Sequence, residues 1–165
     1  MAYSALAVAN AFIERAKQSN IRDLTHMKLQ KLVYFAHAWT LAITGKPLLD
    51  ESVMAWKFGP VIPSLYTEFR KYGSMPINTP ATSFDINNGG GWFNVPNVDD
   101  PAINDILDEV FNIYGSYNAI FLSNLTHSTG SAWTETRHLH HDGSNMGFVI
   151  PNDVIMGCMK SQLGI

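Results

Sequence analysis

Hydrophobic residues recur at helical spacing between Thr25 and Gly45. The Thr25 hydroxyl can cap the start of a helix, and Gly45 suits its end. Because apolar residues cover most of the circumference, we expect this helix to lie in the middle of the domain. Its remaining polar strip consists of Lys28, Gln30 and Lys31. The residues expected to face the core are Leu29, Leu32, Val33, Ala36, Trp39 and Ile43, with Tyr34, Phe35 and Leu41 beside them.

Other segments with the same spacing predict helices on both sides of this central one. Start signals precede several of them, such as Ser4 before the first and Asp99-Asp100-Pro101 before a later one. The predicted helices cover residues 4 to about 19, 63–73, 101–115, 118–127, 131–137 and 151–163.

Two stretches are predicted to be extended. Residues 52–58 alternate as a short strand or arm, and Gly59-Pro60 is predicted to turn the chain sharply. Residues 74–99 form an insert rich in Pro and Gly, in which 84–86 and 92–95 can pair as a hairpin around three glycines or leave a disordered loop. Residues 138–148 are predicted to be a polar loop. The predicted fold is therefore mainly α (α+β): a single domain, 1–165, with six to seven helices and a small β element.

Composition narrows the function classes. The 165 residues are 46% hydrophobic and 15% charged, which excludes a disordered chain. The net charge of -3 makes nucleic-acid binding an unfavoured main task. One cysteine, Cys158, cannot form an intrachain disulfide and favours a reducing compartment. We find no signal peptide and no apolar run long enough to span a membrane, so we expect a cytoplasmic protein.

Catalytic and metal-binding patterns are weak. His138, His140 and His141 could hold a metal ion, but a solvated loop is the favoured interpretation, and no metal or cofactor is predicted. Cys158 lies in an apolar segment, which favours inert packing. The carboxylates of Asp105 and its neighbours fall on the polar side of a helix, where solvation is expected. An enzyme is therefore the less favoured class.

The segment WKFGPVIP, residues 56–63, is a better candidate for function. Aromatic side chains next to a rigid Gly-Pro corner are typical of binding hot spots. The same features also suit a tight packing joint between helices. The sequence favours the joint slightly, and one segment can serve both purposes.

Three blocks of the sequence resemble a known family. They are LTHMKLQKLVYFA at 24–36, AWKFGPVIPSLY at 55–66, and LTH at 125–127 followed by AW at 132–133. Together they resemble the signatures of the Panacea-domain family, also called SocA-like or GepA-like phage-associated proteins. Ala132 stands where a proline often precedes the tryptophan, and Phe58 stands where tyrosine is common.

The resemblance implies a helical antitoxin that neutralises a cognate protein toxin by direct binding, often in a phage or prophage setting. The alternatives are an adaptor that delivers a bound protein to a protease, and a phage counter-defence protein. A homodimer is compatible with the apolar surface. The residues that the resemblance and the 56–63 corner mark for partner binding are Lys28, Gln30, Lys31, Tyr34, Trp56, Lys57, Gly59, Pro60, Tyr66, His127 and Trp133, and Val61 belongs to the same motif.

Polar residues on an otherwise apolar helix are the best contact candidates among these. We therefore expect Gln30→Ala or Lys31→Glu to leave folding intact and to weaken neutralisation. Trp39→Ala is instead expected to lower stability by about 3–5 kcal/mol, as truncations of large buried residues do. A melting curve like that of the wild type would show that Trp39 is not part of the core.

Overall fold

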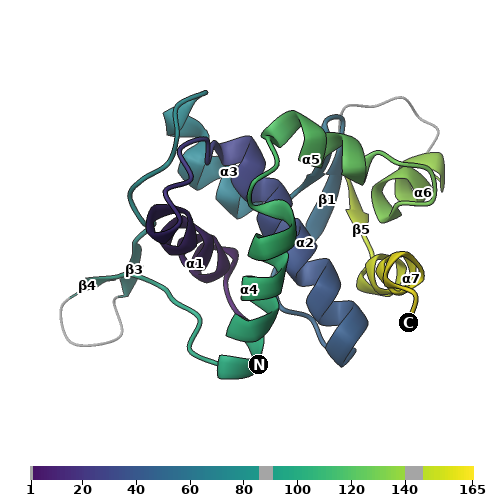
Figure 1. Ribbon diagram of the computed structural model, residues 1–165, viewed down its shortest axis with the longest axis horizontal. Coiled ribbons are helices and arrows are strands. Elements are labelled where there is room, and N and C mark those ends of the chain that lie inside the picture. The colour runs from purple at the N-terminus through teal and green to yellow at the C-terminus, as the bar shows by residue number, and fades with distance from the viewer. Residues whose placement is uncertain (1, 86–90, 140–146) are drawn as a thin grey trace.

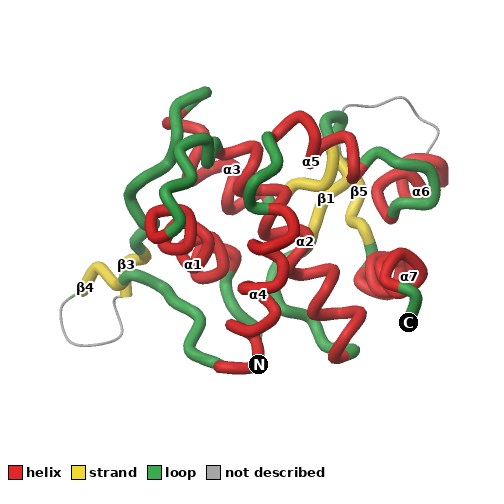
Figure 2. The backbone as a smooth tube through the Cα atoms, viewed as in Figure 1, coloured by secondary structure: helices red, strands yellow, loops and turns green. Residues whose placement is uncertain are grey.

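A computed structural model describes residues 2–85, 91–139 and 147–165. Helices dominate this part of the chain, and the strands lie in two separate places (Figures 1 and 2). The predicted mainly α fold is confirmed. The helices are α1 (Ala5–Gln18), α2 (His26–Thr44), α3 (Pro63–Phe69), α4 (Pro101–Tyr114), α5 (Ala119–Thr126), α6 (Ala132–Leu139) and α7 (Asn152–Leu163). The strands are β1 (Val53–Trp56), β2 (Gly59–Val61), β3 (Ser83–Asp85), β4 (Trp92–Asn94) and β5 (Phe148–Ile150).

Helix α2 is the centre of the fold, as predicted. The Thr25 hydroxyl accepts a hydrogen bond from the Lys28 amide, and Gly45 ends the helix in the left-handed region at φ 73°. Helices α1, α3, α4, α5 and α7 all contact α2 (Figure 1). Its buried residues join one hydrophobic cluster with those of the surrounding elements.

Two details of the α2 prediction are wrong. Ile43, expected in the core, is 52% exposed near the end of the helix. Lys28, Gln30 and Lys31, expected on a polar strip, are buried together with the apolar residues. Helix α2 is therefore covered on nearly every side, and polar groups on it need partners inside the protein.

Trp39 is half-buried, and its indole nitrogen donates to the hydroxyl of Tyr114 at 3.3 Å. The Tyr114 ring stacks on Phe35 with ring centroids 4.2 Å apart. Trp39 thus belongs to the packing between α2 and α4. Because part of its side chain stays in water, we expect the cost of Trp39→Ala near the lower end of the predicted range.

A three-stranded antiparallel sheet has the order β2-β1-β5. Trp56 lies opposite Gly59, so the turn consists of Lys57 and Phe58. The predicted turn at Gly59-Pro60 is therefore misplaced, because these residues form the edge strand β2. The loop predicted at 138–148 is also corrected at its ends, where α6 continues to Leu139 and β5 begins at Phe148.

The insert at 74–99 carries the predicted hairpin, with Phe84 opposite Phe93 in β3 and β4. Ile86 and the glycines at 89 and 90 lie outside the described residues. The insert is held at its base by Asn10 of α1, whose amide exchanges hydrogen bonds with the backbone N–H and C=O of Ala81 at 2.7 and 2.9 Å. The same side chain donates to the Pro96 carbonyl at 2.9 Å.

His37 is fully buried and neutral, and it links α2 to two other segments. Its Nδ1 accepts from the Leu49 amide at 3.3 Å, so the proton is on Nε2, which donates to Asn152 at 2.9 Å. Burial lowers the pKa of His37 below 6.5, although the Asn152 contact opposes this shift.

The lowered pKa makes stability dependent on pH. Below pH 6.5 the unfolded chain binds a proton at His37 more readily than the folded chain does, so the free energy of unfolding falls as pH decreases. The slope contributed by His37 is at most about 1.4 kcal/mol per pH unit. Urea titrations between mildly acidic and neutral pH should show this loss, and His37→Gln should flatten it. An unchanged slope in the variant would contradict a neutral buried His37.

The described residues can be searched for a membrane-spanning helix and for a metal site. Within the described residues, no helix is both long and apolar enough to cross a membrane. In the same part of the chain, no three histidine, cysteine or acidic side chains converge as a metal site. His138 is in the last turn of α6, whereas His140 and His141 lie outside the described residues.

Candidate functional site

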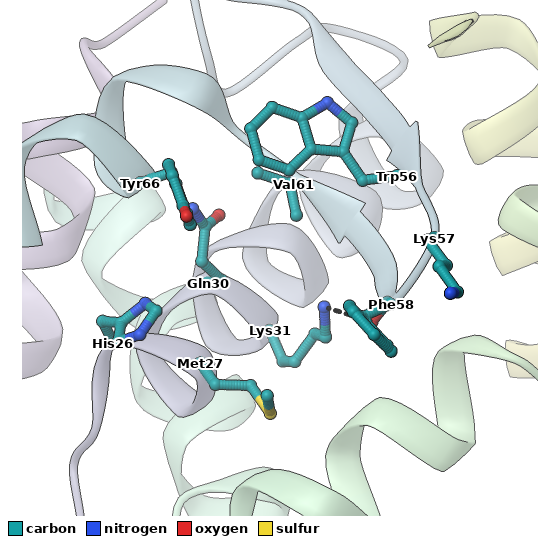
Figure 3. Close-up of a pocket in the computed structure, with 9 residues that line it drawn as sticks. All are labelled: His26, Met27, Gln30, Lys31, Trp56, Lys57, Phe58, Val61 and Tyr66. Atoms are coloured by element: carbon teal, nitrogen blue, oxygen red, sulfur yellow. Dashed lines mark hydrogen bonds between the residues drawn. The ribbon is translucent and has the colours of Figure 1, made fainter. Parts of the chain in front are cut away.

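A groove of about 450 Å³ lies between the start of α2, the β1–β2 hairpin and α3. Its side chains come from both of the first two sequence blocks, although the blocks are separated in the chain (Figure 3). Most of the lining is apolar or aromatic. The lining residues are His26, Met27, Gln30, Lys31, Trp56, Lys57, Phe58, Val61 and Tyr66.

Gln30 fastens α2 to the segment that follows β2. Its amide nitrogen donates to the Ile62 carbonyl at 3.0 Å, and its amide oxygen accepts from the Ile62 N–H at 2.9 Å. Both residues are buried, so these backbone groups have no water to replace the glutamine. A single side chain thus binds both polar backbone groups of one residue, as a neighbouring strand would. The Ile62 carbonyl also accepts from the Leu65 and Tyr66 amides at the start of α3.

Lys31, the next residue of α2, binds backbone carbonyls that precede Ile62 in the chain. Its Nζ donates to the carbonyls of Pro60 at 3.1 Å and Phe58 at 3.4 Å. Carbonyls two residues apart in an extended chain point to the same side, and β2 is an edge of the sheet. Gln30 and Lys31 together therefore cap the open edge of β2, where Pro60 also lacks an N–H.

Gly59 makes room for the Lys31 ammonium. Its φ is 118°, a conformation that residues with a side chain rarely adopt. A Cβ at this position would lie 2.8 Å from Lys31 Nζ and 3.3 Å from the ring of His127. The close approach of Lys31 Nζ to the backbone at residue 59 therefore requires a glycine there. It links the lysine of the first sequence block to the glycine of the second.

Burial dominates the electrostatics of Lys31. The side chain is 2% exposed, and desolvation lowers its pKa from 10.5 to about 8. A shift of this size disfavours the ammonium form by about 3 kcal/mol. No carboxylate lies within ion-pair distance of its Nζ among residues that the structure describes. The buried Lys31 ammonium is thus bound by two backbone carbonyls.

An aromatic wall closes one side of the groove. The rings of Trp56 and Tyr66 meet edge to face at 5.1 Å, and Tyr66 contacts the His26 ring in the same manner at 6.1 Å. Behind Trp56, the indole of Trp133 donates to the Trp56 carbonyl at 2.7 Å. His127 packs on Trp133 with ring centroids 4.1 Å apart. The third sequence block therefore supports the hairpin from beneath.

The groove also exposes apolar side chains to solvent. Phe58 is 70% exposed at the tip of the β1–β2 turn, and Met27 and Tyr66 are 40% and 37% exposed. Figure 3 shows Met27 and Phe58 on either side of the Lys31 side chain, with Trp56 and Tyr66 above them in this view. Large apolar groups around a recess in this way are typical of an interaction site.

The structure brings most of the sequence-predicted residues to this one place. Gln30, Lys31, Trp56, Lys57 and Tyr66 line the groove. Gly59, Pro60, His127 and Trp133 hold its floor or its back through the contacts given above.

Two predicted residues lie elsewhere. The Lys28 ammonium pairs with Asp23 at 2.8 Å, and Tyr34 is buried beside Cys158 on another side of α2. Sequence reasoning did not single out His26 or Met27, and it marked Phe58 only as part of the 56–63 segment. Helical spacing could have found the first two, because positions 26, 27, 30 and 31 share one face of α2.

The chain is similar in sequence to known proteins over most of its length. The family described as "Antitoxin SocA-like, Panacea domain" matches residues 29–134. The chain belongs to this family. Antitoxin SocA of Caulobacter vibrioides (strain NA1000 / CB15N) is 34% identical over 143 residues, which cover 87% of this chain and 74% of the relative. No solved structure matches the chain.

In this chain, hydrogen bonds connect the three sequence blocks that resemble the Panacea-domain signatures. The first block provides Gln30 and Lys31, and the second provides the backbone that both side chains bind, together with Gly59. The third block provides Trp133, which binds the Trp56 carbonyl. The three blocks therefore form one hydrogen-bonded unit that shapes the groove.

Proposed function

We propose that this chain neutralises a cognate protein toxin by binding it directly, and that the groove is the contact surface. Membership of an antitoxin family supports a toxin as the partner. The observation that supports the groove is its exposed apolar rim, because Phe58, Met27 and Tyr66 remain accessible around a recess. Burial of such groups is a main source of affinity between proteins.

The site suits binding better than catalysis. Two of its polar side chains, Gln30 and Lys31, are already engaged with backbone groups of Phe58, Pro60 and Ile62. These contacts hold the hairpin in one conformation. A rigid recess with an aromatic wall loses little entropy when a partner docks. We therefore propose that neutralisation occurs without making or breaking covalent bonds.

The test begins with the reading frames adjacent to the gene. Each is expressed alone and together with this chain, and the growth of the host is measured. We expect one frame to be toxic alone, harmless in the pair, and recovered as a complex with the purified antitoxin. Relief of toxicity without a complex at micromolar concentrations would contradict direct binding.

The same experiment separates neutralisation by occlusion from delivery of the toxin to a protease. Under occlusion, the toxin accumulates as an inert complex, and its half-life is unchanged or longer. An adaptor would instead shorten the half-life of the toxin in growing cells. We propose occlusion, so a shortened half-life would overturn this part of the proposal.

A further inference from the structure

Helix α2 buries two lysines, and they differ in one respect. The Lys28 side chain is 0% exposed, and its ammonium pairs with the Asp23 carboxylate at 2.8 Å. The Lys31 side chain is as deeply buried and contacts two carbonyl oxygens. Within the described part of the chain, no acidic side chain reaches it.

A buried ammonium is costly unless an anion compensates it. Carbonyl dipoles offset part of the desolvation, but a carboxylate offers a full opposite charge and stronger hydrogen bonds. Lys28 has such a carboxylate partner in Asp23. Among the described residues Lys31 has no carboxylate partner, although its side chain borders the open groove (Figure 3).

The rest of the groove has the same sign of charge. Its described lining includes the two cationic side chains Lys31 and Lys57, and neither Asp nor Glu. The whole chain is nevertheless acidic, with a net charge of -3. The groove therefore departs from the charge of the molecule and is complementary to an anionic group on an apolar partner segment.

We propose that the groove binds a segment of the toxin in which a carboxylate reaches Lys31 Nζ and a large apolar side chain packs among Met27, Phe58 and Tyr66. This inference rests on the proposed function, because it names the chemistry of the surface that the toxin presents. The toxin then supplies to Lys31 what Asp23 supplies to Lys28.

The geometry requires the carboxylate and the apolar side chain of the toxin segment to lie close together. Phe58 is 70% exposed and lies beside Lys31 (Figure 3), and the Phe58 carbonyl accepts from Lys31 Nζ at the longer of the two distances, 3.4 Å. A carboxylate that enters beside the Phe58 ring takes over this weaker contact and leaves the one with Pro60 in place. The Lys57 ammonium lies at the same turn, 5.5 Å from the Phe58 ring centroid, and adds to the attraction at the rim.

The test uses short peptides that each carry one Phe or Leu and one Glu at varied spacing, with matched peptides in which Gln replaces the Glu. Binding to the purified full chain is measured by fluorescence anisotropy. For the best spacing we expect the Glu peptide to bind at least about tenfold more tightly than its Gln counterpart, as expected for a desolvated charge pair. In Lys31→Met this ratio falls to about one.

Lys46→Met is the matched control, because Lys46 is an exposed lysine just after α2 that does not line the groove. It should leave the preference for Glu unchanged. Comparison of Glu with Gln peptides on the unaltered chain needs no protein variant, so the test stands even if Lys31→Met folds poorly.

Each outcome has a defined meaning. Equal binding of Glu and Gln peptides, or no binding by any peptide, overturns carboxylate recognition in the groove. A homodimer of the free chain that Lys31→Met dissolves would also overturn it, because the groove would then hold a second copy. If toxicity is still relieved in those cases, the proposed antitoxin function survives; if no adjacent frame is neutralised, the proposed function fails separately.

Discussion

Replacing Gln30 by alanine lowers the free energy of unfolding by about 2–4 kcal/mol, because it leaves the buried Ile62 N–H without its partner and opens a space in the packing. The Ile62 carbonyl keeps the Leu65 and Tyr66 amides as donors. The Ile62 N–H and C=O both bind the Gln30 amide, and Ile62 is fully buried. Alanine offers neither a donor nor an acceptor, and the removed atoms leave space in the packing. The sequence alone suggested that this substitution would leave folding intact, and the structure argues against that expectation.

The measurement is a urea titration followed by circular dichroism. Gln18→Ala is the matched control, because Gln18 is an exposed glutamine on α1 whose amide donates to Glu14 across one helical turn. It should change stability by less than about 0.5 kcal/mol, as exposed substitutions usually do. If the two variants unfolded at the same urea concentration, the Gln30 contacts would not hold the hairpin.

Local signals in the sequence were sufficient to locate most helices. Ser4, Thr25 and Asn118 each accept a hydrogen bond from the backbone at the start of the predicted helix. Gly45 ends α2 in the left-handed conformation that its position suggested. These signals succeed because caps and periodicity act over a few residues, where no distant partner intervenes.

Strand β5 was missed because its partner is far away in the sequence. Phe148–Ile150 pairs with β1, and nothing within three apolar residues reveals that pairing. The turn at Lys57 and Phe58 was misplaced for a related reason. Gly59 and Pro60 are typical of turns, but side chains from α2 hold them in an extended edge strand.

The candidate site was predicted in part. The motif blocks gave Gln30, Lys31, Trp56 and Tyr66, which the fold brings to one groove. They also gave Lys28 and Tyr34, which lie elsewhere. Binding by any of these residues stays a prediction. A motif marks residues that a fold needs, and it does not separate those that face a partner from those that face the protein.

Gln30 and Lys31 illustrate that distinction. A polar residue on an apolar helix can be solvated, or it can be buried with a polar partner, and the helical pattern is the same in both cases. Here the partners are backbone groups of β2 and Ile62. Since β2 is an edge strand that carries a proline, side-chain caps replace the hydrogen bonds that another strand would provide.

Truncation of Phe58 separates binding from stability. Phe58→Ala is expected to weaken binding of the toxin by about 30-fold, which corresponds to the loss of one aromatic hot spot of about 2 kcal/mol. The side chain is 70% exposed, so its removal should change the free energy of unfolding by less than about 0.5 kcal/mol. Isothermal titration calorimetry with the purified toxin measures the first quantity, and urea titration measures the second.

Phe93→Ala is the matched control for Phe58→Ala. Phe93 is 75% exposed on β4, where it pairs with Phe84, and it is not among the residues that line the groove. Both variants remove an exposed phenyl ring from a hairpin, so a general loss of surface hydrophobicity would affect them equally. We expect a large loss of affinity for Phe58→Ala alone. The opposite result would move the toxin contact from the groove to the β3–β4 hairpin and would contradict the proposed binding surface.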